Sequence, residues 1–245
     1  IMYYIKMRPE QIQDCVKRNV PLIMAAGVLE YHGPHLPIGT DALITSDLVK
    51  EIEQRCECVV APDIVYGSTM TWSAGPEEGQ VDFDSHIAYL HTKEIFKRFL
   101  AVGFRRIYVV QHHQAGGEQQ IGLKFAAREA LADISRTWED GWGRYRDSVL
   151  PIPDFFHCIQ VLGLDANSPC PWEIEIGHGS KGETQLMQYY ESDYVDMSRL
   201  NQFEENGVRI PDWLKDSHLG DVVKAKKDMD YCVEAWIKEL SGKEK

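Results

Sequence analysis

The sequence predicts an α/β protein with three layers, in which helices cover both faces of a mostly parallel central sheet. The first observation is that short apolar runs alternate with longer stretches of helical periodicity, the order typical of βαβ units. The second is that these apolar runs are continuous, as expected for strands buried on both faces. At 245 residues the chain is long enough to bury a substantial core without disulfides or metal to hold it folded.

The first half of the chain alternates strand and helix. Residues 21–27 form an apolar run that ends in glycine and predict the first strand. Residues 45–54 are amphipathic and predict a helix, and residues 58–64 predict the second strand. Apolar side chains recur at near-helical spacing over residues 86–100, and a third apolar run follows at residues 106–111. Right-handed crossovers would place the carboxyl ends of these strands at one edge of the sheet.

The second half of the chain is less regular. Residues 117–134 continue the helical pattern, and helices are also predicted over residues 182–190 and 222–240. Around residues 138–170 the sequence is rich in Trp, Gly, Pro and Asp, which predicts an irregular insert or lid. Because no internal repeat or long low-complexity tract divides the chain, we expect one domain spanning residues 1–245.

Composition excludes several classes of function. The net charge is −12, whereas a surface that binds nucleic acid must be basic. No run approaches the roughly 18 apolar residues of a membrane span, and the first residues lack the pattern of a signal peptide. We therefore expect a cytoplasmic protein that acts on a small molecule, with neither nucleic acid nor membrane as a partner. The cysteines match no zinc-finger spacing and are expected to be free, buried or half-buried thiols. They are Cys15, Cys56, Cys58, Cys158, Cys170 and Cys232.

Residue types that bind metals follow the first predicted strand. Glu30 and His32 are two residues apart, so they project to the same side of an extended chain. Gly and Pro residues between His32 and Asp41 let the loop fold back and bring the aspartate close. Two carboxylates and an imidazole form a ligand set that suits Zn²⁺, Mn²⁺ or Fe²⁺. By itself, the same set would also fit an ordinary polar loop.

Two histidines follow the third predicted strand. In an extended chain, one of His112 and His113 would face the edge where the first cluster lies, while its neighbour points away. The alternative is a pair of surface or half-buried histidines that only make hydrogen bonds.

A third polar group precedes the helix predicted over residues 182–190. A Gly-rich turn carries His178, and Glu183 falls in the first helical turn. Glu183 is either a metal ligand, with His178 as a mobile acid or base, or a carboxylate that only complements the helix dipole.

The run from Gly27 to Asp41 resembles the signature of the creatininase (creatinine amidohydrolase) family. That signature reads G-x-L-E-x-H-G-P-H-L-P-x-G-T-D, and the sequence carries it unbroken. Three further segments resemble family motifs: a Tyr-Gly-Ser turn at residues 66–68, a strand-end histidine motif at residues 111–113, and H-A-G-x-x-E-T at residues 178–184. The resemblance therefore spans most of the chain and implies a creatininase-like fold.

The resemblance also implies a centre of two divalent metal ions, either Zn, Mn or Fe. Carried over by position, Glu30, Asp41 and His113 would hold one ion. His32 and Asp41 would hold the second, so that Asp41 bridges the pair. The family frequently assembles as a hexamer, and we accordingly expect a homo-oligomer.

The sequence departs from the family pattern at several positions. Creatininase itself supplies a further glutamate where this chain has Ala115. Glu183 is the expected substitute ligand, and Glu118 is a weaker alternative. Gln-His at residues 111–112 replaces Asn-Gly, and residues 73–79 replace the usual Pro-Gly-Thr segment near the substrate. The departures affect the substrate more than the metal site.

The activity implied by the resemblance is metal-dependent hydrolysis. Metal-activated water would attack a carbonyl group of a small, cyclic substrate, and His178 would deliver a proton to the leaving group. His178 and Glu183 are the expected catalytic residues. The expected substrate contacts are Trp172, Ser68 and Trp72.

Three functions remain open at this point. The first is C–N hydrolysis of a small cyclic amide, as in creatinine amidohydrolase. The second is ring-opening C–C hydrolysis of a cyclic diketone, such as an inositol-derived dehydro-inosose. Trp-lined walls would favour a flat heterocycle, whereas polar and charged walls would favour a polyol-derived ring. The third is a non-catalytic scaffold that binds metal or ligand, which is disfavoured because such a protein does not need a bridged, open metal pair.

Overall fold

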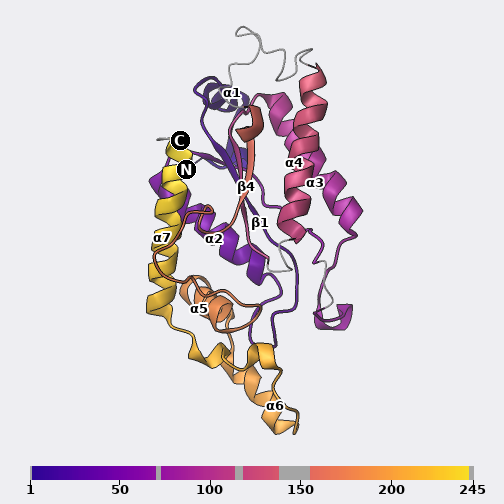
Figure 1. Ribbon diagram of the computed structural model, residues 1–245, viewed down its shortest axis with the longest axis vertical. Helices are drawn as coiled ribbons and strands as arrows, with labels where there is room; N and C mark the ends of the chain where they lie inside the picture. Colours follow the sequence, from indigo (N-terminus) through magenta and orange to yellow (C-terminus); the bar gives the residue numbers. More distant parts are fainter. Residues whose placement is uncertain (1, 70–72, 114–117, 138–154, 243–245) are drawn as a thin grey trace.

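A parallel four-stranded sheet forms the centre of the molecule (Figure 1). The computed structural model describes the chain except for residues 1, 70–72, 114–117, 138–154 and 243–245. The strands are β1 (Leu22–Ala26), β2 (Val59–Val60), β3 (Ile107–Gln111) and β4 (Ile159–Leu162), and their order across the sheet is β2-β1-β3-β4. β1 and β3 pair along their whole length, from Leu22 with Ile107 to Ala26 with Gln111.

Helices form a layer on each face of the sheet (Figure 1). One layer consists of α1 (Pro9–Lys17), α3 (Ser85–Val102) and α4 (Glu118–Thr137). The other consists of α2 (Thr40–Arg55), α5 (Lys181–Tyr190) and α7 (Val222–Ser241). The predicted three-layer α/β fold is confirmed.

Strand side chains alternate between the two layers, as the pleat requires. Leu22 and Met24 of β1 pack in one hydrophobic core with Phe96 of α3. Ile23, between them in the sequence, packs in the opposite core with Trp236 of α7. Burial on both faces explains why the strands read as continuous apolar runs.

The segment between α5 and α7 consists of short helices that extend beyond the sheet (Figure 1). They are η5 (Ser192–Tyr194), η6 (Met197–Asn201), α6 (Gln202–Glu205), η7 (Asp212–Leu214) and η8 (Ser217–Leu219). The other 3-10 helices within the described ranges are η1 (Tyr4–Lys6), η2 (Pro76–Glu78) and η4 (Phe155–His157).

The structure differs from the expected elements in three places. β2 occupies only two residues of the run at 58–64, and an isolated bridge between Ala26 and Ile64 continues the pairing. α1 was not expected, and its apolar stripe is short: Ile12, Cys15 and Val16 pack on the core, and Cys15 alone of the helix is buried. β4 lies inside the region expected to be an irregular insert or lid around residues 138–170. The rest of that expectation falls largely on residues 138–154, outside the described residues.

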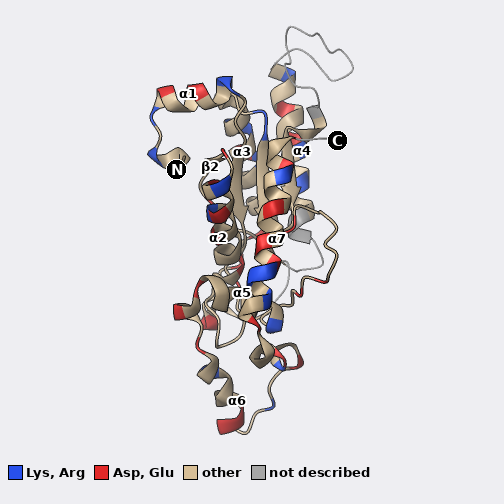
Figure 2. Ribbon diagram, turned by 90° about the vertical axis from the view of Figure 1, so that its left-hand side faces the viewer, with Lys and Arg blue, Asp and Glu red and all other residues tan. Residues whose placement is uncertain are grey.

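Charged residues of both signs occur along the helices (Figure 2). Lys, Arg, Asp and Glu are interspersed along α7 (Figure 2), where Lys226 and Asp230 form an i,i+4 ion pair at 2.6 Å. Among the described residues, no helix is both long enough and apolar enough to cross a membrane. None of the six cysteines, all of which are described, forms a disulfide, and four of them are buried, which agrees with the expectation from their spacing.

Candidate metal centre

The predicted site residues converge at the carboxyl edge of the sheet, where parallel strands place their ligands. Glu30 and His32 lie in the loop after β1, and His113 follows β3. Asp41 is in the first turn of α2, and Glu183 is in the first turn of α5. All five residues are buried, and Asp41 is fully so.

Gly27 permits this convergence. A Cβ atom at this position would lie 2.5 Å from the backbone nitrogen of Ala42. Only a glycine therefore lets the start of α2 close onto the end of β1. This close approach holds Asp41 beside the loop that carries Glu30 and His32.

Glu30, Asp41 and His113 form one group of potential ligands. The Nδ1 atom of His113 lies 3.0 Å from Asp41 Oδ2 and 3.2 Å from Glu30 Oε2. The other ring nitrogen, Nε2, donates to the carbonyl of Thr69 at 2.7 Å. That hydrogen bond fixes the tautomer in which Nδ1 is free to bind a metal ion.

His32, Asp41 and Glu183 form a second group. His32 Nε2 lies 3.2 Å from Asp41 Oδ1 and 3.5 Å from Glu183 Oε2. Nδ1 of the same ring donates to the carbonyl of Glu30 at 2.9 Å, which leaves Nε2 free to bind a metal ion. The two carboxylate oxygens of Asp41 thus face different histidines.

The chemistry of these groups fits a pair of divalent ions. In each group the ligand atoms lie within 4.8 Å of one another. His32 Nε2 and Asp41 Oδ1 are buried, and neither makes a hydrogen bond within the described part of the chain. Buried polar atoms are normally paired, so atoms that converge without hydrogen-bond geometry are suited to a shared cation.

The charges of the site are strongly coupled. Burial alone would lower the pKa of His32, but the carboxylates of Asp41 and Glu183 outweigh it and raise this pKa to about 10. Burial also opposes protonation of His113, yet its contacts with Asp41 and Glu30 raise its pKa to about 10. Without metal, the carboxylates therefore recruit protons onto the two imidazoles, because buried negative charge requires a counter-charge.

His112 is a residue of the site that the sequence-based ligand set omits. Its Nε2 lies 3.0 Å from Glu183 Oε1 and 3.7 Å from Asp41 Oδ1. The expectation that one of the two histidines points away is wrong, because β3 ends at Gln111 and the alternation of a strand no longer applies. The position of His112 directly after a buried strand was the only sequence signal for it.

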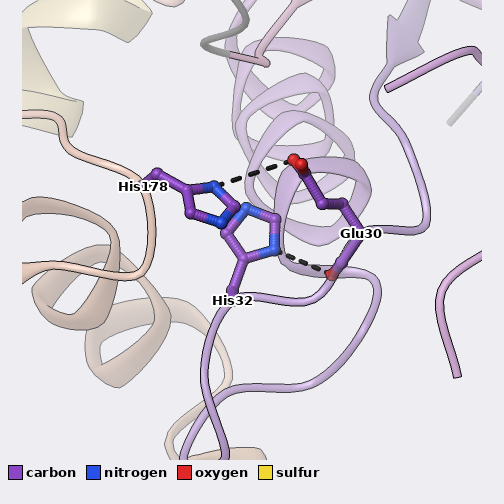
Figure 3. A group of neighbouring side chains, drawn as sticks. All are labelled: Glu30, His32 and His178. Atoms are coloured by element: carbon purple, nitrogen blue, oxygen red, sulfur yellow. Dashed lines mark hydrogen bonds and ion pairs between the residues drawn. The ribbon is translucent and has the colours of Figure 1, made fainter. Parts of the chain in front are cut away.

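His178 lies at the rim of the centre (Figure 3). Its ring centroid is 4.4 Å from that of His32, and its Nδ1 is 3.7 Å from Glu30 Oε2. The side chain is 28% exposed, unlike the buried ligands. Burial and the neighbouring His32 lower the pKa of His178, which favours a neutral imidazole.

A cavity of about 420 Å³ adjoins the centre. His112 and His113 form the wall toward the ligands, while Trp172, Ile174 and Ile176 provide apolar walls. Asp165 adds a carboxylate. Trp172 is held in place by α7, because its Nε1 donates to the buried Asp228 at 2.7 Å.

Of the remaining expected site residues, only Ser68 has a side chain that the structure describes. Ser68 is half-buried and precedes Thr69, whose carbonyl accepts the hydrogen bond from His113. Trp72 lies outside the described residues. Glu118, the alternative ligand, is the first residue of α4, and its side chain is outside what the structure describes.

Comparison with known proteins identifies relatives of this chain. The family model described as creatininase, creatinine amidohydrolase, matches residues 6–235. Creatinine amidohydrolase from Pseudomonas putida is 26% identical over 192 residues, covering 76% of this chain and 68% of that protein. The 3-dehydro-scyllo-inosose hydrolase of Thermotoga maritima is 27% identical over 184 residues, and the match covers 75% of this chain but only 54% of that protein.

Solved structures of creatininase share the fold. A manganese form aligns with a TM-score of 0.73 at 18% identity, covering 98% of this chain and 97% of that chain. A mutant creatininase of the Zn-Zn type aligns with a TM-score of 0.74 at 17% identity, covering 97% and 96% of the two chains.

Proposed function

The chain belongs to the creatininase family, whose members are hydrolases, and on this premise we propose that it hydrolyses a small, cyclic carbonyl compound with metal-activated water. The observation that carries the proposal is the division of Asp41 between two groups of buried ligands. A carboxylate that belongs to both groups could be shared by two metal ions, and a pair of ions close together suits hydrolysis better than a non-catalytic scaffold.

The proposed ligands divide into two groups that share Asp41. Glu30, Asp41 and His113 would hold one ion, and His32, Asp41 and Glu183 would hold the other. The hydrogen bonds to backbone carbonyls orient the two histidines before any ion binds. Zn and Mn are the first choices, because forms of creatininase with these metals share the fold, and Fe fits the same donor types.

The reaction divides between the ions and the protein. When bound, two divalent ions supply a hydroxide nucleophile near neutral pH and polarise the carbonyl group to be attacked. His178 is the proposed proton donor to the leaving group. It is partly exposed and beside the ligands, and as a neutral imidazole it can first accept the proton of the attacking water and then pass it to the leaving group. Glu183 Oε2 accepts a hydrogen bond from Gly179 N at 2.6 Å. This hydrogen bond keeps the turn that carries His178 next to the proposed metal ligands.

The cavity supports C–N hydrolysis of a flat cyclic amide as the first choice. Trp172, Ile174 and Ile176 offer apolar walls suited to a planar ring. Trp172 and Ser68 remain the proposed substrate contacts, together with Trp72.

Ring-opening C–C hydrolysis of a cyclic diketone is the second candidate. It is favoured by the similarity to the inosose hydrolase, which matches at nearly the same identity as creatinine amidohydrolase. The carboxylate of Asp165 in the cavity wall offers a hydrogen-bond acceptor to a hydroxylated ring. To distinguish the two candidates, the purified protein is assayed with a cyclic amide and with a cyclic diketone, and the rates of hydrolysis are compared.

We further propose that the protein is a cytoplasmic homo-oligomer that forms one domain. The absence of a disulfide among the six cysteines suits a reducing compartment, and fractionation of the source cells tests this location. The oligomer is supported by apolar side chains left exposed on α3 and α4, namely Ile87, Leu90, Ile121 and Phe125.

Metal analysis tests the proposal. We expect about two equivalents of Zn, Mn or Fe in the purified protein, as in two-metal hydrolases, and loss of both in Asp41→Ala. Asp47→Asn is the matched control, because Asp47 is a buried aspartate of the same helix outside the ligand groups. An unloaded parent protein after reconstitution, or full loading of Asp41→Ala, would contradict the two-metal hydrolase.

A further inference from the structure

The segment between α5 and α7 folds back against the metal centre. Trp213, in η7, lies with its ring centroid 5.1 Å from that of His178 and tilted by 43°. The same indole meets the ring of Tyr31 edge-on at 6.3 Å. Although Trp213 lies 35 residues after His178, it forms an aromatic wall beside the proposed proton donor.

The turn that carries His178 is built to receive this indole. Gly179 adopts a left-handed conformation, with φ of +58°, and a Cβ there would lie 2.6 Å from Trp213 Cζ3. The carbonyl of Gly179 accepts a hydrogen bond from the buried hydroxyl of Ser217 at 2.9 Å. The segment around Trp213 is thus attached directly to the His178 turn.

No hydrogen bond fixes the imidazole of His178 within the described part of the chain. Its Nε2 is buried without a partner, and its Nδ1 is 3.7 Å from Glu30 Oε2, too far for a hydrogen bond. The histidines that bind metal or transfer protons are usually oriented by a hydrogen bond at the second nitrogen. His178 instead contacts two rings, those of His32 at 4.4 Å and Trp213 at 5.1 Å.

We propose that Trp213 is a positioning residue, which holds the His178 imidazole by ring contact so that it is aimed at the leaving group. His32 is fixed by its hydrogen bond to Glu30 and supplies the rigid second ring. Proton transfer in the transition state depends on this alignment. The inference rests on the proposed role of His178 as the proton donor.

Two variants separate ring contact from simple packing. Trp213→Phe keeps an aromatic face beside His178, whereas Trp213→Leu keeps an apolar side chain without one. Both remove the indole, so a role in packing alone predicts similar behaviour for the two variants. Positioning predicts that only Trp213→Leu is impaired.

The first measurement is the NMR spectrum of histidine-labelled, zinc-loaded protein, with the His178 resonance identified by its absence in His178→Gln. An aromatic ring at this distance shifts the Cε1 proton of the imidazole. We expect this shift in the parent and in Trp213→Phe, and its loss in Trp213→Leu. A His178 resonance that does not move in Trp213→Leu overturns the proposal.

The second measurement is steady-state kinetics with creatinine, or with the cyclic amide or ketone that the parent hydrolyses fastest. We expect kcat of Trp213→Leu to fall about 10- to 100-fold, part of what a positioned acid contributes, with KM and metal content unchanged. Trp213→Phe should retain most of kcat. An unchanged kcat in Trp213→Leu overturns the positioning role even if the NMR shift is lost.

The NMR comparison can be made even if the proposed function is wrong, because it does not depend on a substrate. If the loaded parent hydrolyses no carbonyl substrate, the proposed function is wrong, and the NMR comparison alone decides whether Trp213 orients His178. In that case, loss of the NOE between the His178 and His32 rings, which are 4.4 Å apart, in Trp213→Leu but not in Trp213→Phe supports the positioning, and its persistence in Trp213→Leu overturns it.

Discussion

At the residue scale, Asp41 is the centre of the candidate site. One of its oxygens faces His113 at 3.0 Å and the other faces His32 at 3.2 Å. Burial would raise the pKa of this carboxyl, but His32 and His113 hold it well below its usual range. The carboxylate is therefore ionised and prepared for cations on both sides. Sequence spacing predicts that Asp41 approaches Glu30 and His32, yet it contains no information about which oxygen faces which histidine.

His112 offers a test of how Glu183 is held. His112→Asn removes the contact between His112 Nε2 and Glu183 Oε1, so the glutamate loses an orienting partner. We expect metal affinity to weaken by about 10- to 100-fold, as for other residues that orient metal ligands. Competition with a chromogenic chelator measures the affinity, and the exposed His218 provides His218→Asn as a control. Equal affinities of the parent and His112→Asn would rule out this role.

His35 predicts a pH dependence of stability. It is buried, and its Nε2 contacts the hydroxyl of Thr184 at 2.9 Å. Burial, with a contribution from the charge of His32, lowers its pKa to about 4. In the unfolded chain the ordinary pKa is about 6.5, so the unfolded state takes up this proton first as the pH falls.

The stability conferred by a neutral His35 is therefore present above pH 6.5 and is lost as the pH falls toward 4. The expected loss is about 2 to 3 kcal/mol in the free energy of unfolding. Urea denaturation with chelator present, at several pH values, measures it against His35→Gln, in which this loss is absent. Parallel pH profiles for the two proteins would show that His35 does not contribute.

At the scale of the elements, the site is an assembly of strand ends and helix starts. β1 and β3 deliver Glu30, His32 and His113 at their carboxyl ends, and the first turns of α2 and α5 deliver Asp41 and Glu183. Strand–helix alternation makes this meeting predictable, because parallel strands with right-handed crossovers end at one edge. How closely the end of β1 and the start of α2 approach each other depends on backbone contacts such as the one between Gly27 and Ala42.

Gly27→Ala tests the packing between β1 and α2. The new Cβ would lie 2.5 Å from Ala42 N, so α2 must move away and carry Asp41 with it. We expect a loss of about 1 to 3 kcal/mol in the free energy of unfolding and reduced metal content. Gly122→Ala is the matched control, because Gly122 is inside α4 with nothing within 4 Å of the added Cβ. The control should gain about 1 kcal/mol, and stability of Gly27→Ala at or above that of the parent would refute the contact.

At the scale of the whole molecule, the layer of α3 and α4 leaves several apolar side chains exposed. Ile87 and Leu90 are 56% and 47% exposed in the first turns of α3, and Ile121 and Phe125 are 51% and 64% exposed near the start of α4. The two helices pack against each other in one layer. Helical spacing predicts a buried stripe that includes these residues, and a second copy of the chain would bury what the sheet does not.

Phe125→Glu tests this face as a contact between copies. We expect light scattering to show an oligomer for the parent and a smaller particle for Phe125→Glu, because a buried charge would destabilise the contact. Val223→Glu is the control, since Val223 is 80% exposed on α7, in the opposite layer. A monomeric parent, or dissociation by Val223→Glu alone, would contradict the assignment of this face.

The three-layer fold could be predicted from local patterns in the sequence, and the candidate ligands from the residue types after the strands together with the resemblance to the creatininase family. Burial on two faces produces continuous apolar strands such as β1, and the motif from Gly27 to Asp41 specifies residue types at fixed spacing. Which distant side chains complete the site depends on the tertiary structure. His112 turns inward only because β3 ends one residue earlier, and Trp213 reaches His178 only because the segment after α5 folds back onto Gly179. Contacts between segments far apart in the chain depend on how loops pack, which has no period or spacing that a sequence displays.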